Sequence, residues 1–284
     1  MKIRKTTIMT LDELYRLIRL PEGIINQLSE YETVRNADIP VAVRDKLFSR
    51  PTWDEGVKEL QEYLDDDPYH MNILWEQLNL VCTYSHPEYV RRGIPMGIFA
   101  DTFGFVTRFV SSTRDTYGKY SYNWAWWLPR EITLQEFRIG ALEYEFIDNE
   151  EIKEVGIHIP SDADMSIGSL RNSIMDFLLF EKKYEPDWVD TEMTTETWMI
   201  MPELEEFLPA DSNILRFNHL FEIDQVDYDQ TWYMGWIFPG YSDINEELPE
   251  RTTLQRKLKE YLLAGKKFGI AKGHLLMDRV YSIP

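Results

Sequence analysis

The hydrophobic periodicity of the chain changes once, near Glu136, and this change constrains the fold more than any other feature of the sequence. Before it, apolar residues recur at the three-to-four-residue spacing of helices that bury one face. After it, short runs alternate apolar and polar residues, as half-buried strands do, with helical segments between them. The sequence therefore predicts an α+β protein, with an all-helical N-terminal domain over residues 1–132 and a mixed α/β domain over residues 133–284.

Start and stop signals support several helices in the first half. Capping boxes at residues 10–13 and 52–55 predict two helix starts. Residues 95–117 carry one apolar face throughout, which predicts a single long helix that ends at Gly118.

Three tryptophans, Trp124, Trp126 and Trp127, follow that helix within four residues. They cannot all face one way on a helix, so we expect some of them to pack against a second surface at the junction of the two domains. The alternative is a stacking wall for a ligand. In that case Trp124 and Trp127, together with Trp198 of the second domain, would be substrate-binding residues.

The second half predicts strands and helices in the order strand, strand, helix, strand, helix, strand, helix, strand. The segments are a hairpin over 136–146 and 155–159, a helix from Ser166, a strand over 195–201, a helix from Ser212, a strand over 230–238, a helix from Thr252 or Thr253, and a strand over 268–277. This order indicates a mixed sheet and not a regular doubly wound one.

Charge and composition restrict the partners. The formal net charge of -19 argues against nucleic acid or an anionic membrane as the main partner, which leaves a small-molecule ligand. The N-terminus has no apolar run long enough for a signal peptide, and no stretch approaches the length of a spanning helix. With a single cysteine, Cys82, the chain is expected to be cytoplasmic. The oligomeric state cannot be read from the sequence.

A carboxylate within an apolar run suggests where the site lies. Glu196 precedes the apolar residues 197–201, and Pro202 ends that run. The helix predicted from Ser212 follows after a polar turn. A charged group on a buried strand, next to a polar helix start, is a typical setting for a catalytic or binding site.

Several separated motifs of the second half resemble the GNAT-like C-terminal domain of a family of bacterial acyltransferases. The first half resembles the helical N-terminal domain that accompanies it. The stretches that carry the resemblance are Ile157–Pro160, Glu196–Trp198, Met201–Leu204, Leu208-Pro209, Ser212–Phe217 and Thr252–Gln255 with Gly265 in the second half, and Gly93–Thr102 and Phe137–Glu143 before it. The resemblance implies a GNAT-like fold and transfer of an acyl group from acyl-CoA, as co-substrate, to an amine.

The sequence departs from that family at one motif. Well-studied GNAT enzymes bind pyrophosphate through a loop of the form Gln/Arg-x-x-Gly-x-Gly/Ala. The counterpart here, residues 159–170, contains Gly168 and no second glycine at the required spacing. Glycines let backbone N–H groups approach a pyrophosphate, so we do not expect the usual backbone cradle.

Acyl transfer needs a base to deprotonate the amine, and three residues are candidates for proton transfer. Glu196 is the first candidate base, since apolar neighbours raise the pKa of a carboxyl group. The alternative is a structural carboxylate bonded to Arg216 or to backbone N–H groups. His158 is the second candidate, although a lone strand histidine is often a satisfied structural group. Tyr228 is a candidate acid.

Cations for an anionic cofactor gather near the C-terminus, where residues 251–279 carry an excess of lysine and arginine. Phosphate groups would be bound there or at the two polar helix starts. The candidate cofactor-binding residues are Arg251, Thr252, Thr253, Lys257, Ser212, Asn213 and Arg216. The alternative for the basic segment is a solvated helix face.

The sequence thus supports two hypotheses from different classes. The first is an N-acyltransferase that uses acyl-CoA. The second is a non-catalytic ligand-binding or regulatory protein on a GNAT-like scaffold, which the missing glycine loop favours. A hydrolase is disfavoured because the chain lacks a Gly-x-Ser-x-Gly motif, and its five histidines lack metal-ligand spacing, so no metal is expected.

Overall fold

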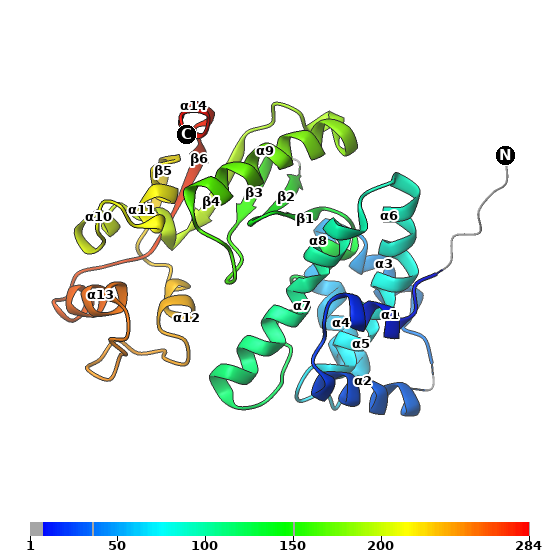
Figure 1. The fold of residues 1–284 in the computed structure, drawn as a ribbon. Coiled ribbons are helices and arrows are strands. Elements are labelled where there is room, and N and C mark those ends of the chain that lie inside the picture. Colours follow the sequence, from blue (N-terminus) through cyan, green and yellow to red (C-terminus); the bar gives the residue numbers. More distant parts are fainter. Residues whose placement is uncertain (1–7, 36, 150, 284) are drawn as a thin grey trace. The chain divides into compact units, whose positions relative to one another are not determined.

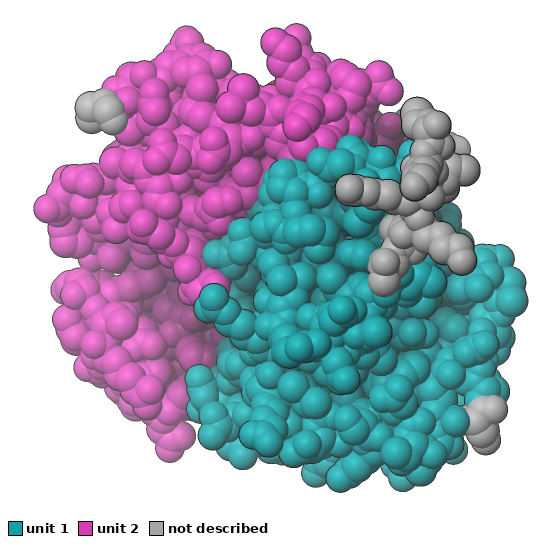
Figure 2. All heavy atoms as spheres, turned by 45° about the vertical axis from the view of Figure 1, so that its right-hand side comes forward, with its two compact units in different colours: residues 1–138 teal, residues 139–284 magenta. Residues whose placement is uncertain are grey.

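Helices make up the chain as far as residue 132, and strands begin at Glu136 in the computed structural model (Figure 1). The structure describes residues 8–35, 37–149 and 151–283. The N-terminal segment for which no signal peptide is expected includes residues 1–7, which lie outside the described residues. The chain divides into two compact units, residues 1–138 and 139–284, coloured separately in Figure 2. The predicted α+β class, helical first and mixed afterwards, is confirmed.

Unit 1 is built from α-helices, of which α5 and α6 are joined without a break by a π-helical segment, Val81–Ser85. Their bounds are α1 (Leu11–Leu17), α2 (Glu22–Val34), α3 (Val41–Leu47), α4 (Trp53–Leu64), α5 (Met71–Leu80), α6 (His86–Arg92), α7 (Met96–Tyr117) and α8 (Pro129–Ile132). The predicted long helix corresponds to α7, which ends where Gly118 adopts a φ of 73°. No helix in the described part of the chain is long and apolar enough to cross a membrane.

The two predicted capping boxes have different outcomes. At α1 the box is present, because Thr10 and Glu13 each accept a hydrogen bond from the other residue's backbone N–H. At α4 the prediction is wrong. Thr52 makes no cap hydrogen bond there, since it belongs to a 3₁₀ turn (Arg50–Thr52) and its hydroxyl donates to the carbonyl of Lys46.

A sheet of six strands organises the described residues of the second half, in the order β1-β2-β3-β4-β6-β5. The strands are β1 (Glu136–Ile139), β2 (Leu142–Asp148), β3 (Lys153–His158), β4 (Met193–Thr197), β5 (Phe221–Asp227) and β6 (Ile270–Leu275). Strands β2 and β3 form the predicted hairpin, and β3 runs parallel to β4. Strand β6 is antiparallel to both β4 and β5.

One face of this sheet is apolar and packs on α9 (Ile167–Tyr184). The rings of Tyr144 and Phe177 stack with centroids 4.0 Å apart. The Ser173 hydroxyl accepts the N–H of Leu142 at 3.2 Å and donates to the carbonyl of Ile139. Helix α9 is therefore fixed to the β1–β2 turn by both apolar and polar contacts.

The opposite face of the sheet is polar. Strand register places Glu145, His158, Glu196 and Lys272 on this face, because residues opposite one another across a ladder point the same way. Lys272 forms an ion pair with Glu154 at 2.9 Å. The ionisable groups that a reaction would need therefore lie on one side of the sheet.

Short helices complete the second half. They are 3₁₀ turns at Pro186–Trp188 (η3) and Trp198–Ile200 (η4), and α-helices α10 (Leu204–Phe207), α11 (Asn213–Asn218), α12 (Tyr233–Ile237), α13 (Thr253–Leu263) and α14 (Met277–Tyr281). The strand predicted over 230–238 is wrong, since α12 lies there. Strand β5 was not predicted.

Candidate active site

The parallel strands β3 and β4 are registered over only two residue pairs, the second of which is Gly156–Thr194. Immediately beyond it, the hydroxyl of Thr195 donates to the carbonyl of Ile157 at 2.8 Å, so a side chain replaces the backbone ladder. Parallel strands that stop pairing part-way leave backbone groups of both strands for a ligand to contact.

His158, the last residue of β3, lies at this opening and contacts a buried carboxylate. Its Nε2 atom is 3.0 Å from Oε2 of Glu145 on β2. The side chain of Glu145 is 5% exposed, and that of His158 is 30% exposed. A carboxylate at one ring nitrogen fixes the orientation of the ring and stabilises the imidazolium form. His158 thus has the partner and the accessibility that a general base needs.

A glycine on the same strand keeps room beside this imidazole. A Cβ atom on Gly156 would lie 3.5 Å from Nε2 of His158 and 3.1 Å from Cδ1 of Ile147. Any larger side chain at this position would extend toward the imidazole or the Ile147 side chain.

Glu196 is not buried, and that part of the prediction is wrong. It lies exposed on β4, opposite Lys272 of β6 in the strand register. Strand β4 also ends earlier than predicted, because the hydroxyl of Thr197 accepts the N–H of Met199 and starts η4. In the described part of the chain no hydrogen bond or ion pair joins Glu196 to Arg216. The apolar setting expected to make Glu196 a base is absent.

Tyr228 lies just beyond β5 and is 41% exposed. Its hydroxyl donates to Oε1 of Glu203 at 2.7 Å, and this hydrogen bond raises the pKa of Tyr228 to about 12. A phenol held by a carboxylate releases its proton less readily than a free one. Tyr228 is therefore poorly suited to act as an acid at neutral pH.

Two family models together match nearly the whole chain. The N-acyltransferase N-terminal domain matches residues 9–134, and the GNAT-like C-terminal domain matches residues 137–275. The chain belongs to the GNAT-like N-acyltransferase family. The first matched range ends at residue 134 and the second begins at residue 137. The predicted domains, 1–132 and 133–284, meet a few residues earlier, and the compact units, 1–138 and 139–284, meet just after residue 137.

Solved structures of acyltransferases share this fold. One, in complex with decanoyl-CoA and teicoplanin, is 18% identical, with a TM-score of 0.67 over 94% of this chain and 99% of that chain. Another, in complex with CoA and 10C-teicoplanin, is 18% identical with a TM-score of 0.68 over the same shares of both chains. A third, with decanoyl-CoA, is 20% identical with a TM-score of 0.66, again over 94% and 99%. No protein of curated function matches the sequence.

The resemblance to GNAT enzymes places a pyrophosphate loop at the start of α9. In this chain, side chains of the same segment cap the start of that helix. Ser166 is the N-cap and accepts the N–H of Ser169, while Asp164 accepts the N–H of Ser166 at 2.9 Å. Hydrogen bonds from the backbone and side chain of Ser166 lower the pKa of Asp164. Gly168 is the second residue of the helix and has no positive φ, so it forms no loop cradle.

The candidate cofactor-binding residues fall into two groups. Ser212, Asn213 and Arg216 belong to α11, which packs against α9 and η4. Ser212 caps α11 by accepting the N–H of Leu215, and Asn213 and Arg216 are exposed. This group lies next to the helix that follows β3.

The second group lies on α13, which packs against α10. The Thr252 hydroxyl accepts the N–H of Gln255, whose Oε1 accepts the N–H groups of Arg251 and Thr252. The Thr253 hydroxyl accepts from the guanidinium of Arg256. Lys257 pairs with Glu260 at 3.2 Å. The donors at this helix start are thus used within the helix, which fits the alternative of a solvated basic face.

The three candidate substrate-binding tryptophans belong to different units. Trp124 and Trp127 are half-buried in unit 1, where the Trp124 ring lies 4.1 Å from that of Phe109, centroid to centroid. Trp127 donates from Nε1 to Oε1 of Glu136 at 3.1 Å. Trp198 opens η4 in unit 2. Their role in substrate binding stays a prediction.

Two residues of interest were missed from the sequence. Glu145 reads as one polar position of an alternating strand, and only the register of β2 against β3 places it beside His158. Arg171 lies in the second turn of α9, and its Nε is buried without a hydrogen-bond partner in the described chain. The sequence did offer a signal for Arg171, because it is a cation five residues after the Ser166 helix cap.

Proposed function

We propose that this protein transfers an acyl group from acyl-CoA to an amine, with His158 as the general base and Glu145 as the residue that positions it. The observation that carries the proposal is the His158–Glu145 contact of 3.0 Å at the point where β3 and β4 stop pairing. Family membership supports the reaction class. The solved acyltransferases of this fold contain CoA or decanoyl-CoA, which supports acyl-CoA as the donor.

In the proposed reaction, the amine nitrogen attacks the thioester carbonyl carbon and forms the C–N bond. His158 accepts the proton that the nitrogen loses, and Glu145 stabilises the resulting imidazolium. The tetrahedral intermediate collapses with cleavage of the C–S bond. The thiolate of CoA leaves and takes up a proton, so the products are an amide and free CoA. No metal takes part in this scheme.

The opening between β3 and β4 suits an extended pantetheine arm. Its amide groups would pair with backbone groups that the shortened ladder leaves available, in the manner of an added strand. For the phosphates we propose Arg171 on α9 and Arg216 on the adjoining α11, with Ser212 and Asn213 beside Arg216. Arginine suits this role because its planar guanidinium binds phosphate oxygens in pairs.

The acceptor is proposed to be an amine on a small molecule. Two of the solved structures of this fold contain teicoplanin or 10C-teicoplanin, which supports the proposal that the fold can hold a large acceptor. Trp124, Trp127 and Trp198 remain the proposed contacts for the acceptor. Acyl-CoA is made and used inside cells, which supports the cytoplasmic location expected from the sequence.

The direct test measures CoA release with a thiol reagent, using acyl-CoAs of several chain lengths and a panel of amines. Cys82 does not interfere, because burial raises the pKa of its thiol to about 12 and leaves it 2% exposed. Amine-dependent thiol release that is lost in His158→Ala supports the proposal. Thiol release that needs no amine, or that is unchanged in the variant, contradicts it.

The phosphate assignment has its own test, by calorimetric titration with CoA. We expect Arg171→Ala and Arg216→Ala each to weaken binding by about tenfold, since each removes a charge-assisted hydrogen bond. The double variant Arg251→Ala/Lys257→Ala tests the α13 group, and Arg256→Ala is the matched surface control. Weakening confined to the α13 variant would move the phosphate site to α13.

A non-catalytic ligand-binding protein is the second candidate, and one observation favours it. Asp164 places a carboxylate at the start of α9, where a pyrophosphate would otherwise find free backbone N–H groups. Calorimetry and the thiol assay separate the two functions. CoA binding without turnover for any acyl donor or amine supports the second candidate.

A further inference from the structure

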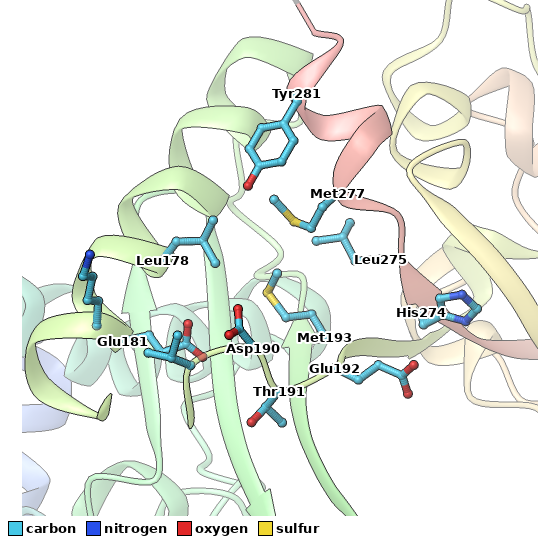
Figure 3. A pocket seen from close by; sticks show the side chains of 12 residues that line it. Leu178, Glu181, Asp190, Thr191, Glu192, Met193, His274, Leu275, Met277 and Tyr281 are labelled. Atoms are coloured by element: carbon cyan, nitrogen blue, oxygen red, sulfur yellow. The ribbon is translucent and has the colours of Figure 1, made fainter. Parts of the chain in front are cut away.

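A cavity in the α/β unit lies outside the proposed acyl-transfer site, and Figure 3 shows the side chains that line it. Its volume is about 470 Å³, and its walls come from the C-terminal half of α9, the segment 189–193, the end of β6 and α14. It opens at the start of β4, whereas His158 lies at the other end of the parallel pair. Val155 of β3 is level with Met193, so His158 is three residues, or roughly 10 Å, further along that strand.

The cavity contains a buried carboxylate without a partner. Glu181 of α9 is 3% exposed, and its carboxylate makes no hydrogen bond or ion pair with the residues that the structure describes. Burial, together with the nearby charge of Asp190, raises the pKa of Glu181 to about 7. Figure 3 shows the carboxylates of Glu181 and Asp190 on the same side of the cavity. Burial of a carboxylate without hydrogen-bond partners lowers the stability of the folded protein unless a ligand supplies the missing contacts.

The remainder of the lining defines what such a ligand must offer. Apolar side chains from several elements line much of the cavity, namely Leu178, Val189, Met193, Leu275 and Met277. The other charged and titratable groups that face the cavity are Glu192, Lys182, His274 and Tyr281. His274 is engaged with Asp224, at 2.8 Å. Three carboxylates therefore face one lysine, and the cavity favours a cation that carries an apolar body.

A metal ion fits this cavity less well than an organic cation. In the described part of the chain, no third carboxylate or imidazole converges with Glu181 and Asp190 closely enough to complete a metal site. Hard cations need six or more oxygen ligands, and the apolar side chains supply none.

We propose that this cavity is a binding site for an organic ammonium ion with an aliphatic or aromatic body, distinct from the acyl-transfer site. The ammonium group binds between Glu181 and Asp190, and its apolar part packs on Leu178 and Met193. Through such a site, at the end of β4 away from His158, the protein binds an amine that it does not acylate.

The probe is N,N-dimethylhexylamine, a tertiary amine that cannot yield a stable amide and so cannot serve as an acceptor. Calorimetric titration near pH 8 is expected to show binding to the wild type. Glu181→Gln is expected to weaken binding by about tenfold or more, because it removes the buried charge that meets the ammonium. The control Asp187→Asn, an exposed acid of η3 that does not line the cavity, is expected to bind as the wild type does. Hexan-1-ol, the neutral counterpart of the probe, is expected to bind at least about tenfold more weakly.

A second measurement needs no variant. From pH 6 to pH 8 the ionised fraction of Glu181 rises about tenfold, so affinity for the probe is expected to rise by a similar factor. The pH dependence that remains in Glu181→Gln measures what the other groups of the cavity contribute. No binding at millimolar probe, equal binding by Glu181→Gln, or equal binding of hexan-1-ol overturns the proposal. The thiol-release assay with acceptor amines is independent of every one of these outcomes.

Discussion

The Nε2 atom of His158 lies 3.0 Å from a carboxylate oxygen of Glu145, although 13 residues separate the two in the chain. The antiparallel register of β2 and β3 produces this contact, since it sets Glu143 opposite His158 and Glu145 opposite Gly156 on the same face. The pair unites an accessible imidazole with a buried acid at the end of the shortened β3–β4 ladder. That arrangement predicts which of two substitutions, His158→Ala or Glu145→Gln, lowers kcat more.

We expect His158→Ala to lower kcat by about a hundredfold to ten-thousandfold, the usual contribution of a general base. Glu145→Gln keeps the shape but removes the charge that stabilises the imidazolium, so its kcat should fall between those of the wild type and His158→Ala. The measurement is steady-state thiol release at saturating acyl-CoA. The matched control is His219→Gln, which breaks an exposed histidine–carboxylate pair, His219 to Glu205 at 3.2 Å, elsewhere in the unit. Equal loss in the control would mean that His158 acts through stability alone.

Tyr228→Phe should leave kcat within about threefold of the wild type, because a phenol whose pKa is raised to about 12 donates a proton poorly. Its hydroxyl bonds an exposed carboxylate, Glu203, so the stability change should also be small. Steady-state kinetics and thermal unfolding of the same preparation check both statements. A loss of kcat by two orders of magnitude, with the melting temperature unchanged, would restore Tyr228 as the acid.

The architecture could largely be predicted from the sequence, and the reasons for the exceptions are physical. The amphipathic pattern of α7 and the apolar–polar alternation of β2 and β3 distinguish the two faces of each element, which is the signal that periodicity carries. Strand β5 alternates apolar and polar residues from Phe221 to Asp224, but a register shift between Ile223 and Gln225 interrupts the pattern. In α12 the buried residues Tyr233, Met234 and Ile237 fit a helix, yet a run this short also reads as a strand.

The site was less predictable, because it depends on which strands become neighbours. Glu196 lies in an apolar stretch of sequence, but the strand ends at Thr197 and leaves the carboxylate exposed. His158 was a candidate from its residue type, whereas Glu145 became one only through the register. The cavity around Glu181 joins α9, β4, β6 and α14, which are distant in sequence, so no local pattern marks it.

Gly269→Ala should destabilise the protein by about 3 kcal/mol, at the upper end of the cost of inserting a carbon where none fits. Gly269 lies just before β6, and a Cβ atom there would come within 2.0 Å of the carbonyl oxygen of Asp227 and 2.8 Å of Cα of Tyr228. Those atoms belong to the backbone, so they cannot move aside cheaply. Denaturant unfolding measures the change.

The matched control for Gly269→Ala is Gly168→Ala. Gly168 is helical, and no atom lies within 4 Å of the position that an added methyl group would take, so alanine should raise stability by about 0.5–1 kcal/mol. It should also leave the affinity for CoA unchanged, because Gly168 forms no phosphate cradle. Loss of CoA binding in Gly168→Ala would show that the start of α9 binds the cofactor through its backbone after all.

The last prediction concerns the pH dependence of stability at Glu181. Its pKa in the folded protein is about 7, against an ordinary value of 4.5, so the folded state favours the protonated acid. The associated stability is fully present below pH 4.5 and is lost as the pH rises through 7, by up to about 3 kcal/mol. Glu181→Gln cannot ionise, so it should unfold at higher denaturant concentration than the wild type at pH 8 and at a similar concentration at pH 5. Asp187→Asn should follow the wild type at both values, and an equal effect of Glu181→Gln at pH 5 and pH 8 would contradict the raised pKa.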